Sequence, residues 1–370
     1  MSRVLQKTLF YIIILSFISY LIPAFTVSAN TDNKSGYVVI EQTTKRVLSE
    51  KNKDLKLPMA STTKIVTALV VLEHADLSDK VIIPKCAEGV EGSSIYIKAG
   101  ETYTVEDLLY GLMLRSGNDS AVALAMHVSG SIEKFCSLMN EKAIAVGATN
   151  TNFVNPHGLH DQNHYTTAYD LALLTAEAYN NENFIKIVSS KKYKLKDSYI
   201  YNKNKLLGSY EGADGVKTGY TTKSGRCLVS SSKRDGMRVI CVVLNYYDMW
   251  DKSKELMTTA HKKYDLIKVL SKDDLTQTNV INGIKREVKC SVNSDFYYPL
   301  TVDEISSLSY EKEVFDTQAP VYTNQICGTV KVYLDKCLIF EKNIYTIENV
   351  RKKTFLDWLN ELTNIKNFGA

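Results

Sequence analysis

The sequence lacks the features of a nucleic-acid-binding or disordered protein. Its 370 residues include 45 basic and 41 acidic side chains, which leave a formal net charge of only +4. No basic patch interleaved with aromatic residues accompanies this charge, and the chain has no internal repeat and no low-complexity linker. Because 45% of the residues are apolar, the chain can bury a full core. We therefore expect a globular protein without a nucleic-acid partner.

Closely spaced cysteines are also absent. The chain has seven cysteines, an odd number, and most of them lie in apolar runs such as the Cys-Val-Val-Leu segment at 241–244. An exported disulfide scaffold usually carries an even number at regular spacings. A thiol in an apolar run behaves as a small hydrophobic side chain, so we expect buried free thiols. The seven residues are Cys86, Cys136, Cys227, Cys241, Cys290, Cys327 and Cys337.

The first 29 residues have the three-part layout of a secretory signal. Arg3 and Lys7 are the only charged residues of this segment, and an almost wholly apolar run of 17 residues follows them. The Val-Ser-Ala triplet at 27–29 supplies small residues where a signal peptidase cleaves. A retained membrane helix is the alternative, because such a run is nearly long enough to span a bilayer. Pro23 and the small-residue site favour cleavage, so we expect residues 1–29 to direct export.

The other end of the chain, residues 351–370, predicts an amphipathic helix. Its apolar side chains recur at helical spacing on one face, and Lys352 and Lys353 stand at its entry. A terminal helix packed on the protein's own core is the alternative. Tryptophan and phenylalanine favour a lipid interface, so we expect a peripheral anchor on the extracytoplasmic face of the cell membrane. The apolar residues of this face are Phe355, Trp358, Leu359, Leu362, Ile365 and Phe368.

Helix and strand patterns divide the rest of the chain in two. Residues 30–272 place strands on both sides of a helical middle, which predicts an α+β domain with a mostly antiparallel sheet and a helical insert. Residues 273–350 contain short β-rich pieces and predict a small all-β domain. The expected elements are helices over 61–74, 104–114, 131–146, 167–180 and 252–270, and strands over 37–47, 225–232, 237–245, 283–292, 319–323, 328–334 and 338–346, with a turn at Asp335-Lys336.

A Ser-x-x-Lys motif opens the first of these helices. Positions i and i+3 share one helical face, so the Lys64 amine can reach the Ser61 hydroxyl. Lys64 can activate Ser61 as a nucleophile only if its pKa falls well below about 10.4. The motif alone is weak, because Ser-x-x-Lys also occurs at Ser131, Ser189, Ser230 and Ser309.

Two further motifs follow in the chain. Ser116-Gly-Asn118 lies between two predicted helices, where its hydroxyl can relay a proton and its amide can bind a peptide group, although a simple helix cap would look the same. Lys217-Thr218-Gly219 occurs once, and on an edge strand its cation and hydroxyl would suit a carboxylate. A surface turn is the alternative for this tripeptide. Each motif is unspecific by itself, but the three in this order and setting predict a serine acyl-transfer enzyme.

The three motifs together resemble those of penicillin-binding proteins and serine β-lactamases. More closely, the chain resembles the low-molecular-mass D-alanyl-D-alanine carboxypeptidases, and the export signal, β-rich tail and terminal helix resemble theirs as well. The resemblance covers nearly the whole chain. It is carried by Leu57-Pro-Met-Ala-Ser-Thr-Thr-Lys64, Arg115-Ser-Gly-Asn-Asp119, Pro156-His-Gly-Leu159 and Asp214-Gly-Val-Lys-Thr-Gly-Tyr220.

The resemblance implies a role for each of these residues. It makes Ser61 the nucleophile that attacks the bond between the two terminal D-alanines of a peptidoglycan stem peptide, Lys64 the general base, and Ser116 the proton relay. It makes Asn118, Lys217 and Thr218 substrate ligands, and the backbone N–H groups of Ser61 and Tyr220 the oxyanion hole. β-Lactam antibiotics are implied as inhibitors, and no cofactor or metal is expected.

One departure and three alternatives accompany this resemblance. Carboxypeptidases of this group often carry an arginine after the last core strand, whereas residues 246–252 contain none, which leaves the carboxylate to Lys217 and Thr218. A β-lactamase would need a deacylating Glu-x-x-Leu-Asn pattern, which is missing between the second and third motifs. A metallohydrolase could use the histidines at 157, 160 and 164, but no His-Glu-x-x-His helix exists. A non-catalytic module that senses β-lactams or binds the wall would not need the complete set of catalytic side chains.

Overall fold

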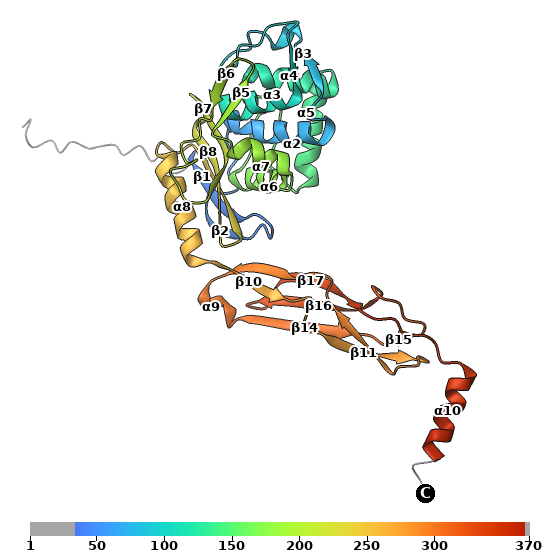
Figure 1. Cartoon of the computed structure of the whole chain (residues 1–370). Coiled ribbons are helices and arrows are strands. Elements are labelled where there is room, and N and C mark those ends of the chain that lie inside the picture. Colours follow the sequence, from blue (N-terminus) through green and yellow to red (C-terminus); the bar gives the residue numbers. More distant parts are fainter. Residues whose placement is uncertain (1–33, 367–370) are drawn as a thin grey trace, which may run out of the picture. The chain divides into compact units, whose positions relative to one another are not determined.

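The computed structural model of the protein describes the backbone of residues 34–366 and the side chains of residues 34–360. The predicted signal peptide, residues 1–29, lies outside the described residues, as do residues 367–370 of the predicted anchor. Figure 1 traces helices and a sheet as far as α8, then a series of strands, and then the last helix α10. The predicted fold class, an α+β region with a helical insert followed by a β-rich region and a terminal helix, is confirmed.

Within residues 36–244, an antiparallel five-stranded sheet has the order β2-β1-β9-β8-β7. The first strand thus pairs with the last one, and β7 forms an edge. The strand predicted over 37–47 is wrong in its second half, because the Glu41 carboxylate accepts hydrogen bonds from the backbone N–H groups of Thr43 and Thr44 and closes a turn. The strands are β1 (Gly36–Glu41), β2 (Val47–Lys51), β7 (Ala213–Thr221), β8 (Gly225–Arg234) and β9 (Met237–Leu244).

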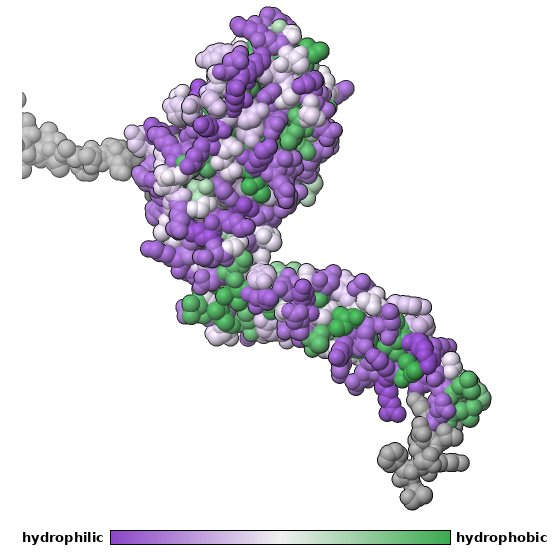
Figure 2. Space-filling model, in the orientation of Figure 1, coloured by the Kyte–Doolittle hydropathy of each residue, from purple (hydrophilic) through white to green (hydrophobic). Residues whose placement is uncertain are grey.

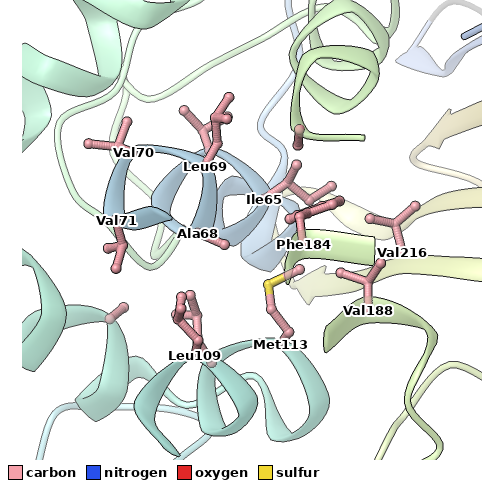
Figure 3. Close-up of a cluster of buried hydrophobic side chains, with 14 of the residues drawn as sticks. Ile65, Ala68, Leu69, Val70, Val71, Leu109, Met113, Phe184, Val188 and Val216 are labelled. Atoms are coloured by element: carbon pink, nitrogen blue, oxygen red, sulfur yellow. The ribbon is translucent and has the colours of Figure 1, made fainter. Parts of the chain in front are cut away.

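Alternation along β8 and β9 buries both faces of this sheet, each against a different set of helices. One face packs on α2 (Lys64–His74) and the helical insert, and the other packs on α8 (Met249–Lys263) (Figure 1). The helix α2 runs through the middle of the larger core and is buried over its first eight residues. Figure 3 shows its side chains facing those of neighbouring elements: Ile65, Ala68, Leu69, Val70 and Val71 of α2, with Leu109, Met113, Phe184, Val188 and Val216.

The helical insert contains the helices that the sequence predicts. A capping box at Thr104 and Asp107 opens α3, within the helix predicted over 104–114, and the helix continues as a π-helical turn. The elements are η3 (Lys85–Ala87), α3 (Val105–Tyr110), η4 (Gly111–Arg115), α4 (Asn118–Ser129), α5 (Ile132–Ala145), α6 (Ala168–Ala178) and α7 (Glu182–Ser189), with the hairpins β3 (Lys80–Ile82)–β4 (Thr102–Thr104) and β5 (Lys192–Leu195)–β6 (Ser198–Tyr201).

The helix predicted over 252–270 is wrong in its last part. It ends at Lys263, because Tyr264 is extended, and the chain continues as β10 (Asp265–Leu270). This segment pairs with β13 (Phe296–Leu300), which lies more than two dozen residues further along the chain. Strand pairing at this separation overrides the local helical pattern, and no periodicity in 252–270 signals it.

The β-rich region forms a six-stranded sheet within residues 276–346, in the order β14-β16-β17-β12-β11-β15. The predicted turn at Asp335-Lys336 is confirmed, since both residues adopt positive φ (48° and 67°) between β16 and β17. The strand predicted over 319–323 is wrong, because Pro320 has no N–H for a ladder. The elements are β11 (Thr276–Ile281), β12 (Glu287–Ser291), α9 (Val302–Ile305), β14 (Leu308–Val314), β15 (Thr317–Gln318), β16 (Ile326–Leu334) and β17 (Cys337–Thr346).

The cysteines are free thiols throughout the described residues. Five of them are buried, as the sequence predicts, whereas Cys86 and Cys337 are exposed. Cys86 is the middle residue of the short element η3, and Cys337 is the first residue of β17, directly after the turn at Asp335-Lys336.

Candidate active site

Ser61 lies in a turn that immediately precedes α2. The helix predicted from Ser61 begins three residues later, at Lys64, and Ala60–Thr63 forms a 3₁₀ turn, η2. The hydroxyls of Thr62 and Thr63 donate to the carbonyls of Met59 and Ala60, at 2.7 and 2.8 Å, and hold this turn closed. Ala60 adopts a positive φ of 49°, which is uncommon for a residue with a side chain. The turn thus presents the half-buried Ser61 hydroxyl just before the first residue of the helix.

Lys64 is fully buried, and its Nζ lies at hydrogen-bond distance from three partners. Its Nζ lies 2.9 Å from Ser61 Oγ, 2.7 Å from Asn118 Oδ1 and 2.5 Å from the carbonyl oxygen of His157. Burial holds its pKa well below 10.5, and the positive charges of Lys217 and Lys203 lower this pKa further. A neutral amine at hydrogen-bond distance from a hydroxyl can accept its proton, so the pair has the geometry of a base and its nucleophile.

The second motif lies where the π-helical turn η4 meets α4. Ser116 adopts a left-handed conformation (φ 66°), and its side chain is buried beside the start of α4 at Asn118. Asn118 links two parts of the site, because its Oδ1 accepts from Lys64 and its Nδ2 donates to the Glu91 carbonyl. The neighbouring Asp119 is buried and accepts hydrogen bonds from Ser94, Ile95 and Ile97. The motif therefore binds the lysine and also holds the loop around residues 91–97.

The third motif lies on the edge strand β7, against the Ser61 turn. A Cβ on Gly219 would lie 3.1 Å from the Ser61 nitrogen and 3.0 Å from the Met59 carbonyl oxygen, so glycine permits this close approach. Lys217 is buried, and its Nζ donates to the Thr218 carbonyl at 3.1 Å. Thr218 is half-buried, and Tyr220 is exposed. The strand thus brings Lys217, Thr218 and the backbone of Tyr220 beside the Ser61 turn.

Lys203 is a functional candidate that sequence reasoning missed. It lies in the loop after β6, where its Nζ donates to Ser93 Oγ at 3.1 Å. Burial of Lys217 and, after it, the charge of Lys203 lower the pKa of Lys217 to about 7, and the charge of Lys203 also lowers the pKa of Lys64. No motif spacing marks Lys203, because only the fold brings this loop beside the two other lysines.

The loop around Gly158 packs closely against the turn that contains Ser61. Gly158 adopts a φ of +90°, and a Cβ at this position would lie 1.9 Å from the Ala60 carbonyl oxygen. The Thr67 hydroxyl donates to the Pro156 carbonyl at 2.6 Å and fixes the same loop to α2. The Pro-His-Gly-Leu segment therefore packs against the turn that carries Ser61 and is fixed to α2.

We expect Gly158→Ala to weaken both folding and acylation. The change adds backbone strain at positive φ and a clash that forces the Ala60 carbonyl to move, so the free energy of unfolding should fall by about 3 kcal/mol. Gly147→Ala is the matched control, because Gly147 has a similar φ of +84° and nothing within 4 Å of an added Cβ. Urea unfolding and the rate of acylation by a fluorescent penicillin measure both effects. Equal losses in the two variants would contradict a role for the Gly158 loop in supporting Ser61.

Two of the three histidines considered as metal ligands, His157 and His164, lie close to the Ser61 turn and have lowered pKa values. His164 is buried, its Nδ1 accepts from the Val154 N–H, and its Nε2 lies 2.8 Å from Thr63 Oγ1. Burial lowers its pKa to about 4, so the ring is neutral and can donate to Thr63. Burial and the charge of Lys64 lower the pKa of His157 to about 3. Within residues 34–366, no group of three metal-ligating side chains comes together.

Two models of known protein families match the sequence. Residues 24–247 match the model of the D-alanyl-D-alanine carboxypeptidase family, and residues 264–352 match that of the C-terminal domain of penicillin-binding protein 5. The two matches together include all three motifs and the β-rich region.

Individual relatives agree with the family models. The chain is 31% identical over 342 residues to the D-alanyl-D-alanine carboxypeptidase DacF of Bacillus subtilis, an alignment that covers 87% of each chain. It is 31% identical over 349 residues to DacC of Escherichia coli, covering 89% of this chain and 87% of that one. The crystal structure of penicillin-binding protein 5 from Haemophilus influenzae superposes with a TM-score of 0.74 at 30% identity, covering 86% of this chain and 97% of that one.

Proposed function

This chain belongs to the D-alanyl-D-alanine carboxypeptidase family, and we propose that it removes the terminal D-alanine from peptidoglycan stem peptides through an acyl-enzyme on Ser61. The observation that carries this proposal is the short contact between Lys64 Nζ and Ser61 Oγ, made by a lysine whose pKa burial holds low. Relatives named D-alanyl-D-alanine carboxypeptidases, aligned over most of both chains, support the substrate class.

The proposed reaction has two halves. The neutral Lys64 takes the proton of Ser61 as Oγ attacks the carbonyl carbon of the penultimate D-alanine, and the backbone N–H groups of Ser61 and Tyr220 bind the resulting oxyanion. Ser116 passes the proton to the amine of the departing D-alanine as the peptide bond breaks. Water then adds to the ester carbonyl, the Ser61–acyl bond breaks, and a proton from that water restores the Ser61 hydroxyl. Asn118 binds the peptide backbone, and Lys217 and Thr218 bind the terminal carboxylate.

The assay for this proposal is release of D-alanine from a diacetyl-L-Lys-D-Ala-D-Ala peptide. We expect turnover of the peptide and, with benzylpenicillin, a stable acyl-enzyme that hydrolyses slowly, because the chain lacks the deacylating pattern of a β-lactamase. Penicillin labelling without peptide turnover would instead support a β-lactam-sensing module. Rapid turnover of penicillin would support a β-lactamase.

The proposal also places the enzyme outside the cytoplasm, where its substrate lies, with α10 as a peripheral anchor. The helix α10 (Phe355–Lys366) follows a cap in which the Thr354 N–H donates to the Asp357 carboxylate at 2.9 Å. Its first turns expose Phe355 (71%) and Trp358 (51%), and their rings stack with centroids 6.0 Å apart. Figure 2 shows this apolar patch at the described start of the helix. No helix of residues 34–366 is long and apolar enough to cross a membrane.

We expect the paired change Phe355→Glu with Trp358→Glu to release the enzyme from membranes and leave peptidase activity unchanged. Two charges on the lipid-facing side of α10 would oppose its insertion into the interface. Co-sedimentation with phosphatidylglycerol–phosphatidylethanolamine vesicles measures this, and Leu275→Glu with Ile305→Glu controls for charge added at exposed apolar sites of the β-rich region. If the α10 variant sediments like the parent protein, α10 is not the anchor.

A further inference from the structure

An arginine that no motif includes lies beside the third motif. Arg226 is the second residue of β8, and the register of the sheet pairs it with Tyr220 of β7. Thr218 pairs with Leu228, so Arg226 is the diagonal neighbour of Thr218. Side chains two apart in a strand share a face, and diagonal pairs lie about 7–8 Å apart, within reach of an arginine. Arg226, Tyr220 and Thr218 therefore project from the same face of the sheet.

The guanidinium of Arg226 is held in place but carries no acidic partner. Its Nη1 donates to the Tyr247 carbonyl at 3.1 Å, and its Cζ lies 4.6 Å from the centre of the Tyr247 ring. Within residues 34–366, Arg226 makes no ion pair with a carboxylate. A guanidinium has five N–H donors, so several remain for a ligand. The side chain is exposed, which leaves these donors accessible.

The same guanidinium lines an open hollow at the end of the β7–β8 hairpin. The hollow has a volume of about 590 Å³, and its lining includes Tyr220, the residue that follows the Lys-Thr-Gly motif. A ligand that binds along β7 and ends beside Thr218 would therefore have the Arg226 guanidinium beyond that end. The lining residues are Tyr220, Gly225, Arg226, Asn245, Tyr247 and Met249.

We propose that Arg226 binds the terminal carboxylate of the substrate together with Thr218. This inference rests on the proposed function and adds to it a specificity-determining residue outside the three motifs. A planar guanidinium can donate two parallel hydrogen bonds to one carboxylate, which fixes its orientation. The stacking on Tyr247 keeps the group in position before the substrate arrives. Residues 246–252 contain no arginine, so the guanidinium comes instead from Arg226 on β8, and Tyr247 of that segment stacks on it.

The charge of the site at neutral pH favours this assignment. Burial and the charge of Lys203 lower the pKa of Lys217 to about 7, so Lys217 is only partly charged in the empty site at that pH. An arginine stays charged at every pH at which the enzyme works. Arg226 therefore supplies a permanent positive charge, whereas the charge of Lys217 depends on pH and on the bound ligand.

The test compares two peptides that differ only at the group Arg226 would bind. They are diacetyl-L-Lys-D-Ala-D-Ala and its C-terminal amide, assayed with the full chain and with Arg226→Gln, Arg226→Lys and Arg234→Gln. Arg234 is the matched control, because it lies at the other end of β8, stacks 4.7 Å from the Tyr210 ring and donates to the Glu211 carbonyl. Urea unfolding of each variant shows whether the substitution alters folding.

With Arg226→Gln we expect kcat/KM for the carboxylate peptide to fall by about 10- to 100-fold, chiefly through KM, because a charge-assisted hydrogen bond is lost. The amide peptide should change by less than about threefold, Arg226→Lys should lie between, and Arg234→Gln should match the parent. An equal loss with both peptides would overturn the proposal and give Arg226 a purely structural role. Unchanged kcat/KM for the carboxylate peptide would overturn it too.

Failure of the proposed function is a separate result, namely a parent protein that releases no D-alanine. Arg226 would then be tested by the acylation rates with benzylpenicillin, which carries a carboxylate, and with its methyl ester. A loss confined to the free acid in Arg226→Gln would support carboxylate binding by Arg226. Equal rates for the variant and the parent with the free acid would overturn it.

Discussion

Ser61→Ala is expected to abolish both D-alanine release and covalent labelling by benzylpenicillin. The acyl-enzyme needs a hydroxyl beside a neutral base, and Ser61 Oγ lies 2.9 Å from the buried amine of Lys64. We expect kcat/KM for the D-Ala-D-Ala peptide to fall by about three orders of magnitude or more. Intact-mass spectrometry after penicillin treatment should show one added penicillin on the parent protein and none on the variant.

Ser309→Ala is the matched control for this change. Ser309 also begins a Ser-x-x-Lys sequence, with Lys312, but it lies exposed on β14 of the β-rich region. This variant should keep the activity and the labelling of the parent. A penicillin adduct that persists on the Ser61 variant at another residue would show that Ser61 is not the nucleophile.

Lys64→Arg is expected to lose acylation although it keeps a positive side chain. The reaction needs an amine that can be neutral, and an arginine does not deprotonate near neutral pH. The acylation rate of the parent should rise with pH through the lowered pKa of Lys64, because the neutral amine accumulates as the pH increases. The variant should lack this rising limb, and its rate should be lower by about three orders of magnitude.

Stopped-flow measurement of acylation by a fluorescent penicillin between pH 5 and pH 10 would follow this limb. The control is Lys134→Arg, which changes the lysine of the Ser131 motif at an exposed position on α5. That variant should follow the profile of the parent. A rising limb of normal amplitude in Lys64→Arg would mean that a different group takes the proton of Ser61.

The site could be predicted from the sequence to the extent that its chemistry is local. The spacing of Ser61 and Lys64 is set within one helical turn, so their contact follows from the sequence even though a 3₁₀ turn replaces the expected start of the helix. Ser116 and Asn118 lie at a junction between helices, as the predicted helix pattern places them. The strand that carries Lys217 is an edge strand, as a cation presented to a cleft requires.

Three of the misses, namely β10, Lys203 and Arg226, share one cause, which is dependence on residues far apart in the chain. The predicted helix does not extend to Leu270, because residues 265–270 form β10 and pair with β13, which is remote in the sequence. Lys203 acts on Lys64 and Lys217 from a loop without any pattern of its own. No sequence pattern marks Arg226, since only the pairing of β7 with β8 brings it near Thr218 and only the fold brings Tyr247 to its side chain.

The sequence by itself determined that Ser61 and Lys64 meet, and in which order the three motifs follow, because side chains three residues apart on a helical turn must meet wherever the helix lies. The tertiary structure alone decided the electrostatics. Burial of Lys64 and Lys217 and the approach of Lys203 lower the two pKa values, and none of these effects exists until the sheet and the helical insert pack together. A lysine in an unfolded chain keeps its ordinary pKa and cannot serve as this base, so the fold makes the motif reactive.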